Sequence, residues 1–137
     1  MSSRVAILIG NGRSVDPLEL QALEGPLHDV HDLAPVLRDS KRGGFHVLSL
    51  VDATTSETID AIEAGLQQAG REGLFFLYFA GWGVLDRDDR LYLATADTRL
   101  ATGQLLTIKV SDEFRQIRSK SGLAVGVLAS SPRVQSP

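Results

Sequence analysis

The sequence predicts an α/β fold in which helices flank a parallel sheet. Four short apolar runs, at about residues 4–10, 45–51, 74–80 and 123–129, have the length and continuity of strands buried on both faces. Helical patterns lie between them, as the crossover connections of a parallel sheet require. We predict the strand order 2-1-3-4, which places the run at 74–80 inside the sheet.

Length and composition suit one soluble domain. The chain has 137 residues, of which 43% are hydrophobic and 23% charged, and a net charge of -3. Without a basic patch we predict no nucleic-acid partner, and without an apolar stretch of roughly 20 residues no membrane span. The chain has no cysteine, which excludes disulfides and a thiol nucleophile and is compatible with a cytoplasmic location.

The first strand ends in a glycine-rich turn, Gly10-Asn11-Gly12. Such turns can cradle phosphate, but GNGRSV lacks the full spacing of a dinucleotide motif and no helix follows at once. A turn whose glycines supply positive φ is the favoured interpretation. A nucleotide or small-ligand site at residues 10–13 remains an alternative.

The first helix is predicted to begin near Pro26, a residue suited to a first helical position. Pro35 removes one backbone donor and should kink this helix or end its regular part. The residues expected to form its buried stripe are Leu27, Val30, Leu33 and Leu37.

Histidine and aspartate side chains share the same helix. His28 is four residues from Asp32 and three from His31, so each pair can lie on one face, a spacing compatible with zinc. A solvated helix face is the favoured interpretation, because no further ligand cluster is apparent in the sequence.

The second helix has clear end signals. Thr54 and Glu57 fit a capping box, and Gly70 stands where a C-cap glycine would. The apolar residues of this helix are Ile59, Ile62, Leu66 and Ala69.

A small hairpin is predicted after the third strand, over residues 84–95, with a charged turn at 86–90. That acidic turn could hold a cation, but it supplies few of the six or more oxygens that calcium takes, and a solvated turn is favoured. A third helix is predicted from Ser111 as N-cap to Lys120, with Phe114 and Ile117 turned inward.

Gly81-Trp82-Gly83 follows the predicted interior strand. In open α/β sheets, binding and chemistry collect beyond the carboxyl ends of the strands. We therefore expect the functional site at or near Trp82.

Six blocks of sequence together resemble the caspase-like cysteine peptidases (peptidase C14), and most of all the bacterial metacaspase-type members. They are RVAILIGNG, LHDVHDLAPVL, GGFHVLSLVDAT, LFFLYFAGWG, LYLATADT and GVLASS, in family order and spacing from Arg4 to Ser131. The resemblance implies a three-layer caspase-like domain over residues 1–131, corresponding to the large-subunit portion and lacking the last C-terminal strands of the family. Residues 132–137 are expected to be a disordered tail.

The resemblance also locates the catalytic positions, and neither carries the family residue. Trp82 stands at the dyad histidine and Ser131 at the nucleophilic cysteine, with Ala129 at an aspartate of the cysteine motif. Gly83 is equivalent to an oxyanion-hole residue. An indole N–H is only a donor, and a serine hydroxyl without a base is a weak nucleophile. No intact catalytic residue, cofactor site or metal site is predicted.

These substitutions lead to two hypotheses. The first is a catalytically inactive caspase-like domain that acts as a regulatory or protein-binding module, with a bacterial stress or defence pathway as the setting. The alternative is a hydrolase of the cysteine-peptidase family with a rearranged or incomplete site. We expect a protein partner or self-association through the uncharged edge strand 123–129. Trp82 either extends that surface or folds inward.

Overall fold

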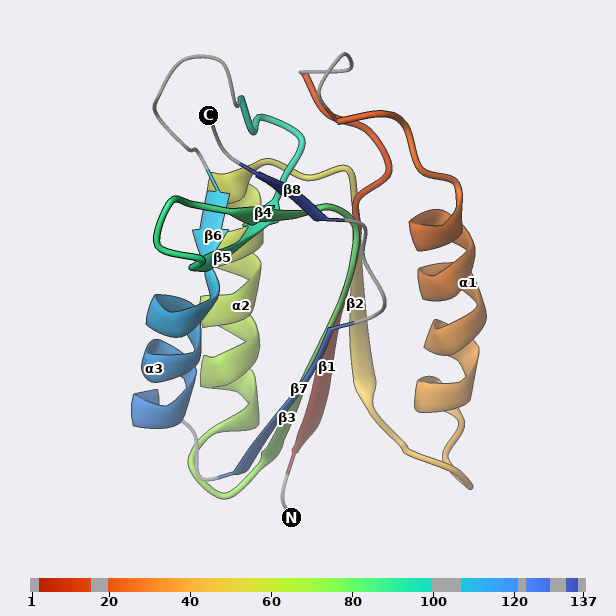
Figure 1. Cartoon of the computed structure of the whole chain (residues 1–137). Coiled ribbons are helices and arrows are strands. Elements are labelled where there is room, and N and C mark those ends of the chain that lie inside the picture. Colours follow the sequence, from red (N-terminus) through yellow and green to blue (C-terminus); the bar gives the residue numbers. More distant parts are fainter. Residues whose placement is uncertain (1–2, 16–19, 100–106, 121–122, 129–132, 136–137) are drawn as a thin grey trace.

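The computed structural model describes residues 3–15, 20–99, 107–120, 123–128 and 133–135. A sheet of four parallel strands runs through the molecule in the order β2-β1-β3-β7 (Figure 1). This is the predicted order, and β3 lies inside the sheet as expected. The strands are β1 (Arg4–Gly10), β2 (His46–Val51), β3 (Leu74–Ala80) and β7 (Leu123–Leu128).

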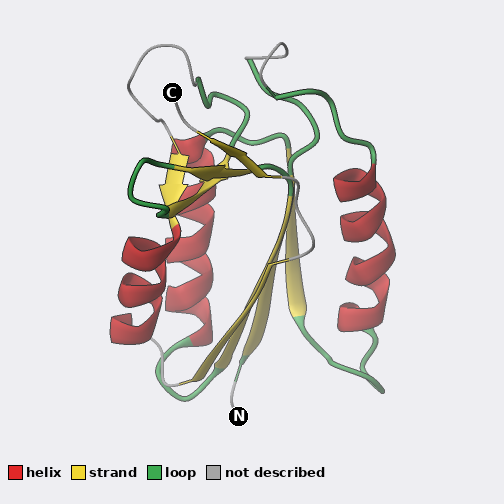
Figure 2. Ribbon diagram, viewed as in Figure 1, coloured by secondary structure: helices red, strands yellow, loops and turns green. Residues whose placement is uncertain are grey.

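Helices cover both faces of this sheet and complete three layers. Helix α1 (Gly25–Arg38) lies on one face, while α2 (Thr55–Ala69) and α3 (Val110–Lys120) lie on the other (Figures 1 and 2). Within the described residues, no helix is long and apolar enough to cross a membrane. The α/β prediction with helices on both faces is confirmed.

Strand β1 shows why the sheet must be covered on both sides. Its side chains alternate between the layers: Val5, Ile7 and Ile9 join the core under α2, while Ala6 and Leu8 join the core under α1. All five are buried, as expected for the continuous apolar runs of a parallel sheet.

The predicted ends of α2 are confirmed. Thr54 Oγ1 accepts from the Glu57 amide at 3.2 Å, and Glu57 Oε1 accepts from the Thr54 amide at 3.0 Å. Gly70, with φ of +68°, closes the helix in a conformation that other residues rarely adopt. Ile62 and Leu66 are buried against β1 and β3, so the apolar stripe of this helix faces the core.

The predicted stripe of α1 is only partly right. Val30 is buried, but Leu27 is 39% exposed, and Pro26 and Ala34 are buried instead. The helix packs on β1 and β2 through Val30 and Ala34, which leaves Leu27 beside the open edge of β2. The helix continues past Pro35 to Arg38.

A second, smaller sheet lies beyond the carboxyl ends of the main strands. Its strand order is β6-β5-β4-β8, and its members are β4 (Gly83–Leu85), β5 (Leu91–Ala94), β6 (Thr107–Lys109) and β8 (Arg133–Gln135). The antiparallel pair β4–β5 is the predicted hairpin.

Two predictions in this region are wrong. Residues 133–135 were expected in a disordered tail, but they form β8, which gains main-chain partners along β4. Helix α3 begins at Val110 rather than after a Ser111 N-cap, because it follows β6 directly and Val110 packs against the core. Ile117 is buried as predicted, whereas the side chain of Phe114 lies outside the described residues.

Candidate functional site

Trp82 is fixed by contacts on two sides. It follows Gly81 at the carboxyl end of β3, and its half-buried ring packs in a cluster with Leu20 and Val84. Its indole Nε1 donates a hydrogen bond to the carbonyl oxygen of Gln21 at 2.8 Å. The only polar atom of the side chain is therefore already used, and the geometry matches the inward-folded alternative better than a free aromatic rim.

The main-chain groups of Gly83 face a neighbouring strand. The Ala94 amide donates to Trp82 O at 3.0 Å, so Trp82 and Ala94 form a hydrogen-bonded pair. In an antiparallel ladder the next pair, Gly83 with Leu93, is then of the non-hydrogen-bonded kind. The Gly83 amide thus points away from β5 and towards β8, where Arg133 is its register partner. The Gly83 amide is therefore directed at strand β8 of the same chain.

Ser131, the predicted equivalent of the nucleophilic cysteine, lies outside the described residues, as does Ala129. Strand β7 leads towards it, and Leu128 is the register partner of Phe79 near the end of β3. The two predicted positions thus follow the ends of neighbouring strands.

The histidines belong to other parts of the fold. His28 and His31 line a groove between α1 and β2, and His46 begins β2. The described partners of Trp82 come instead from residues 20–21 and from the small sheet.

The glycine-rich turn after β1 is occupied by a carboxylate of the chain itself. Asp52 Oδ1 accepts from the Gly12 amide at 2.7 Å and from the Arg13 amide at 2.9 Å. These amides are the donors that a phosphate would need, and a second anion beside Asp52 would be repelled. A Cβ atom at Gly12 would collide with Leu23 O, so this glycine is explained by close chain packing. The geometry disfavours the nucleotide alternative.

Asn11 joins three strands at the same end of the fold, a role that the sequence did not reveal. Its amide donates to Ala80 O at 2.8 Å, and its Nδ2 donates to Ala94 O at 2.9 Å. It is buried, and Oδ1 has no hydrogen-bond partner among the described residues. Asn11 therefore ties the small sheet to β1 and β3.

A second network, also missed in the sequence, fastens the start of α2 to the loop after β5. Asp97 Oδ1 accepts from the Thr55 amide at 2.9 Å and from the Thr95 hydroxyl at 2.8 Å. Burial raises the pKa of Asp97, but hydrogen bonds from Thr55 and Thr95 outweigh burial and hold that pKa below its usual value. The aspartate acts as a structural anion at the helix N-terminus.

The acidic turn at residues 86–90 uses its own carboxylate. Asp86 Oδ1 accepts from the amides of Asp88 (2.8 Å) and Arg90 (2.9 Å), and Oδ2 accepts from the Tyr92 hydroxyl. The bond from the Arg90 amide is the main reason why the pKa of Asp86 lies below its usual value. The carboxylate closes the hairpin turn.

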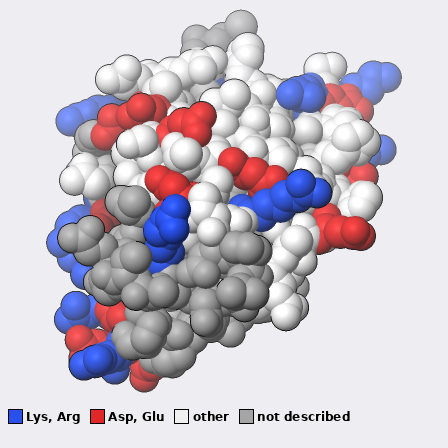
Figure 3. Space-filling view, turned by 90° about the horizontal axis from the view of Figure 1, so that it is seen from above, with Lys and Arg blue, Asp and Glu red and all other residues white. Residues whose placement is uncertain are grey.

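The histidines and aspartates of α1 do not gather into a metal site. His31 Nδ1 lies 3.5 Å from Asp32 Oδ1, and these side chains are 88% and 82% exposed. Among the described residues, no group of three or more histidine, aspartate or glutamate side chains is placed to hold a metal ion. On the face of the molecule seen in Figure 3, the acidic and basic side chains of the described residues are interspersed.

Comparison with protein-family models gives a match over most of the chain. Residues 3–125 match the family model of the caspase domain, peptidase C14, a range that includes Trp82 and Gly83 and stops before Ser131. No curated protein matches the chain. The match covers most of the sequence and the parallel sheet with its flanking helices, and the chain therefore belongs to the caspase-domain family.

Proposed function

We propose that this caspase-family domain is catalytically inactive and acts as a regulatory or protein-binding module. The observation that supports this most is the state of Trp82. At the position that the family resemblance gives to the dyad histidine, the indole ring is packed between the small sheet and Leu20, and its N–H is bound to Gln21 O.

The chemistry of this position supports the same conclusion. Cysteine-peptidase catalysis needs a thiolate, and an imidazole that helps to generate it and returns a proton to the leaving amine. The chain has no cysteine, and the indole of Trp82 has no basic lone pair. Ser131 would need a base to become a useful nucleophile, and the histidines at 28, 31 and 46 belong to α1 and β2.

A binding role is supported by the edge that β7 forms in the main sheet. Within the described residues, β7 is the last strand of the order and pairs with β3 alone. Its sequence, LAVGVL, has no charged residue that would deter pairing. An edge of this kind offers a row of main-chain donors and acceptors to another strand, from a second copy or from a different protein. A regulatory complex with an active family member, in a bacterial stress or defence pathway, is the role we propose.

Sedimentation velocity tests the proposed edge. We expect the wild-type chain to self-associate at high concentration, or to capture a partner from host lysate. Val125→Lys and Val127→Lys should each reduce that association, because a lysine on an edge strand deters pairing with another strand. Val15→Lys is the matched control, since Val15 is 47% exposed in a loop outside both sheets. A wild-type chain that stays monomeric and captures nothing would refute the binding role.

A further inference from the structure

The other edge of the main sheet is β2, a strand with an open side-chain surface. Four of its six residues are exposed, and Leu48 and Val51 are each 45% exposed. Leu27 of α1, 39% exposed, lies beside the same strand. Apart from His46, the side chains of β2 cannot carry charge. Natural edge strands are usually protected by charges, prolines or a covering segment.

The hydrogen-bonding pattern shows which main-chain groups of β2 face outward. The Asp52 amide donates to Gly10 O at 3.1 Å. The N–H and C=O groups of successive strand residues point in alternate directions, so those of the even-numbered residues of β2 point towards β1. The N–H and C=O groups of Val47, Ser49 and Val51 therefore point outward, away from β1. In agreement with this direction, Arg38 Nη2 donates to Val47 O at 3.5 Å.

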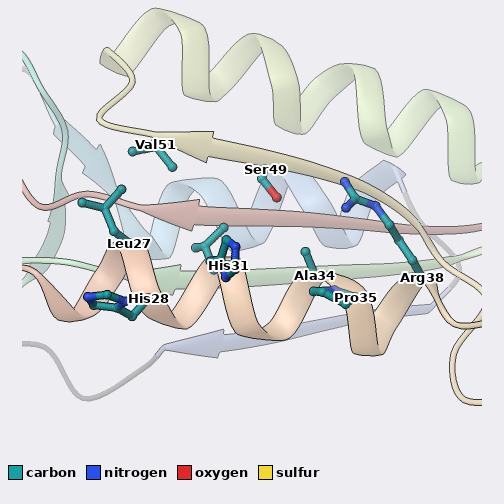
Figure 4. A pocket seen from close by; sticks show the side chains of 9 residues that line it. Leu27, His28, His31, Ala34, Pro35, Arg38, Ser49 and Val51 are labelled. Carbon is teal, nitrogen blue, oxygen red and sulfur yellow. The ribbon is translucent and has the colours of Figure 1, made fainter.

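Hollows border β2 on both faces. On the α1 side, a groove of about 500 Å³ runs between the helix and the strand (Figure 4). On the α2 side, a hollow of about 280 Å³ includes His46, Leu48 and Gln68 in its lining. Side chains alternate in direction along a strand. A strand added to β2 would place them alternately over the groove and over the hollow, which is how strand addition achieves specificity.

Charge is distributed unevenly along the groove between α1 and β2. Its polar lining consists of His28, His31, Arg38 and Ser49, with no carboxylate. The neighbouring acidic groups have other contacts: Asp29 accepts from the Tyr78 hydroxyl at 3.3 Å, and Asp32 contacts His31. Arg38 lies at one end of the groove and Leu27 at the other (Figure 4). Arg38, the cationic residue of this lining, is thus at the Val47 end, whereas Leu27 and His28 are at the Val51 end.

We propose that β2 binds an extended segment of a partner protein by antiparallel strand addition. Residues opposite each other in a sheet share a face, so partner residues opposite Val47, Ser49 and Val51 point into the groove. The segment should carry apolar side chains opposite Ser49 and Val51 and an aspartate or glutamate opposite Val47, next to Arg38. This surface goes beyond the proposed function and depends neither on the state of the dyad nor on β7.

A second copy of the chain fits this edge less well. Antiparallel pairing of two β2 strands about Ser49 would set Val47 of one copy opposite Val51 of the other. Arg38 of each copy would then approach the Leu27 and His28 end of the other groove, where the groove lining has no carboxylate. Charge complementarity favours an acidic partner segment.

A designed peptide tests this proposal by fluorescence anisotropy. The probe is fluorescein-labelled Thr-Val-Thr-Val-Thr-Glu-Thr. Its C-terminus is amidated, so that the glutamate side chain is the only carboxylate of the peptide. In antiparallel register its valines lie opposite Val51 and Ser49, and its glutamate opposite Val47. We expect saturable binding that weakens at least tenfold when lysine replaces the glutamate. Arg38→Glu should reverse this preference between the two peptides.

Main-chain pairing is tested from both sides of the contact. Ser49→Pro removes an outward N–H and leaves the β1 ladder intact, so we expect binding to fall at least tenfold. If that variant does not fold, the peptide still gives the answer: N-methylation of its central valine should abolish binding, whereas N-methylation of the threonine that follows should not. The first amide faces β2, and the second faces away.

Several outcomes would overturn the proposal. Absence of saturable binding to the wild-type chain contradicts it, as does binding that ignores the position of the N-methyl group. Loss of binding in Val125→Lys with retention in Arg38→Glu would place the peptide on β7. Self-association that Ser49→Pro abolishes would identify a second copy as the occupant. Peptidase activity of the chain would refute the proposed function and leave this surface unaffected.

Discussion

Replacing Phe75 with alanine is expected to lower the free energy of unfolding by about 3–5 kcal/mol. Phe75 is fully buried in the core between β3 and α2, where it packs with Ile62 and Leu66. Truncation removes a large apolar side chain and leaves a cavity that a close-packed interior fills only in part. Denaturant unfolding followed by circular dichroism measures the change.

The control for Phe75 is Val36→Ala on α1. Val36 is 40% exposed, and its truncation should change the free energy of unfolding by no more than about 0.5 kcal/mol. A Phe75→Ala variant with the stability of this control would show that the α2 face of the sheet is not packed as described.

Replacing Trp82 with alanine should cost about 2–3 kcal/mol of unfolding free energy, below the range for a fully buried aromatic ring because the side chain is half-exposed. The variant loses packing against Leu20 and Val84 and the hydrogen bond to Gln21 O. Thermal and denaturant unfolding of the purified variant would check this value.

Trp82→Phe separates packing from hydrogen bonding. Phenylalanine keeps an aromatic ring and loses the N–H donor, so about 1 kcal/mol should be lost. If Trp82→Ala leaves stability unchanged, the indole is not part of the structure around residues 20–21, and the argument that it fills the dyad position fails.

The main sheet could be predicted because its signal is local. Continuous apolar runs identify strands buried on both faces, and the helical patterns between them require parallel crossovers. The ends of α2 were also predictable, since Thr54, Glu57 and Gly70 act on their own turn of chain. These features depend little on distant partners.

The elements that were missed depend on distant partners. Strand β8 exists through pairing with β4, 50 residues earlier in the sequence, so the short run 133–135 gave no signal of its own. Leu27 follows the helical period but lies beyond the sheet edge, because β2 has no strand outside it among the described residues. Periodicity identifies an apolar face and not the width of the sheet beneath it.

In the candidate site, too, the features with a local sequence signal were predicted, and those that depend on distant partners were missed. Trp82 and Gly83 were located by their place after β3 and by the family blocks. The roles of Asn11 and Asp52 were missed, since their partners lie about 40 residues away or more. An aspartate directly after a parallel strand was the available signal, because such residues meet at the carboxyl edge of the sheet.

Hydrolysis of fluorogenic peptides with arginine, lysine or aspartate before the scissile bond tests the central claim most directly. An active caspase-family enzyme serves as the positive control. We predict no hydrolysis by the purified wild-type chain above the buffer blank, because the chain has no cysteine and the indole of Trp82 cannot act as a base. Robust cleavage by the unmodified chain that Ser131→Ala abolishes would contradict the account.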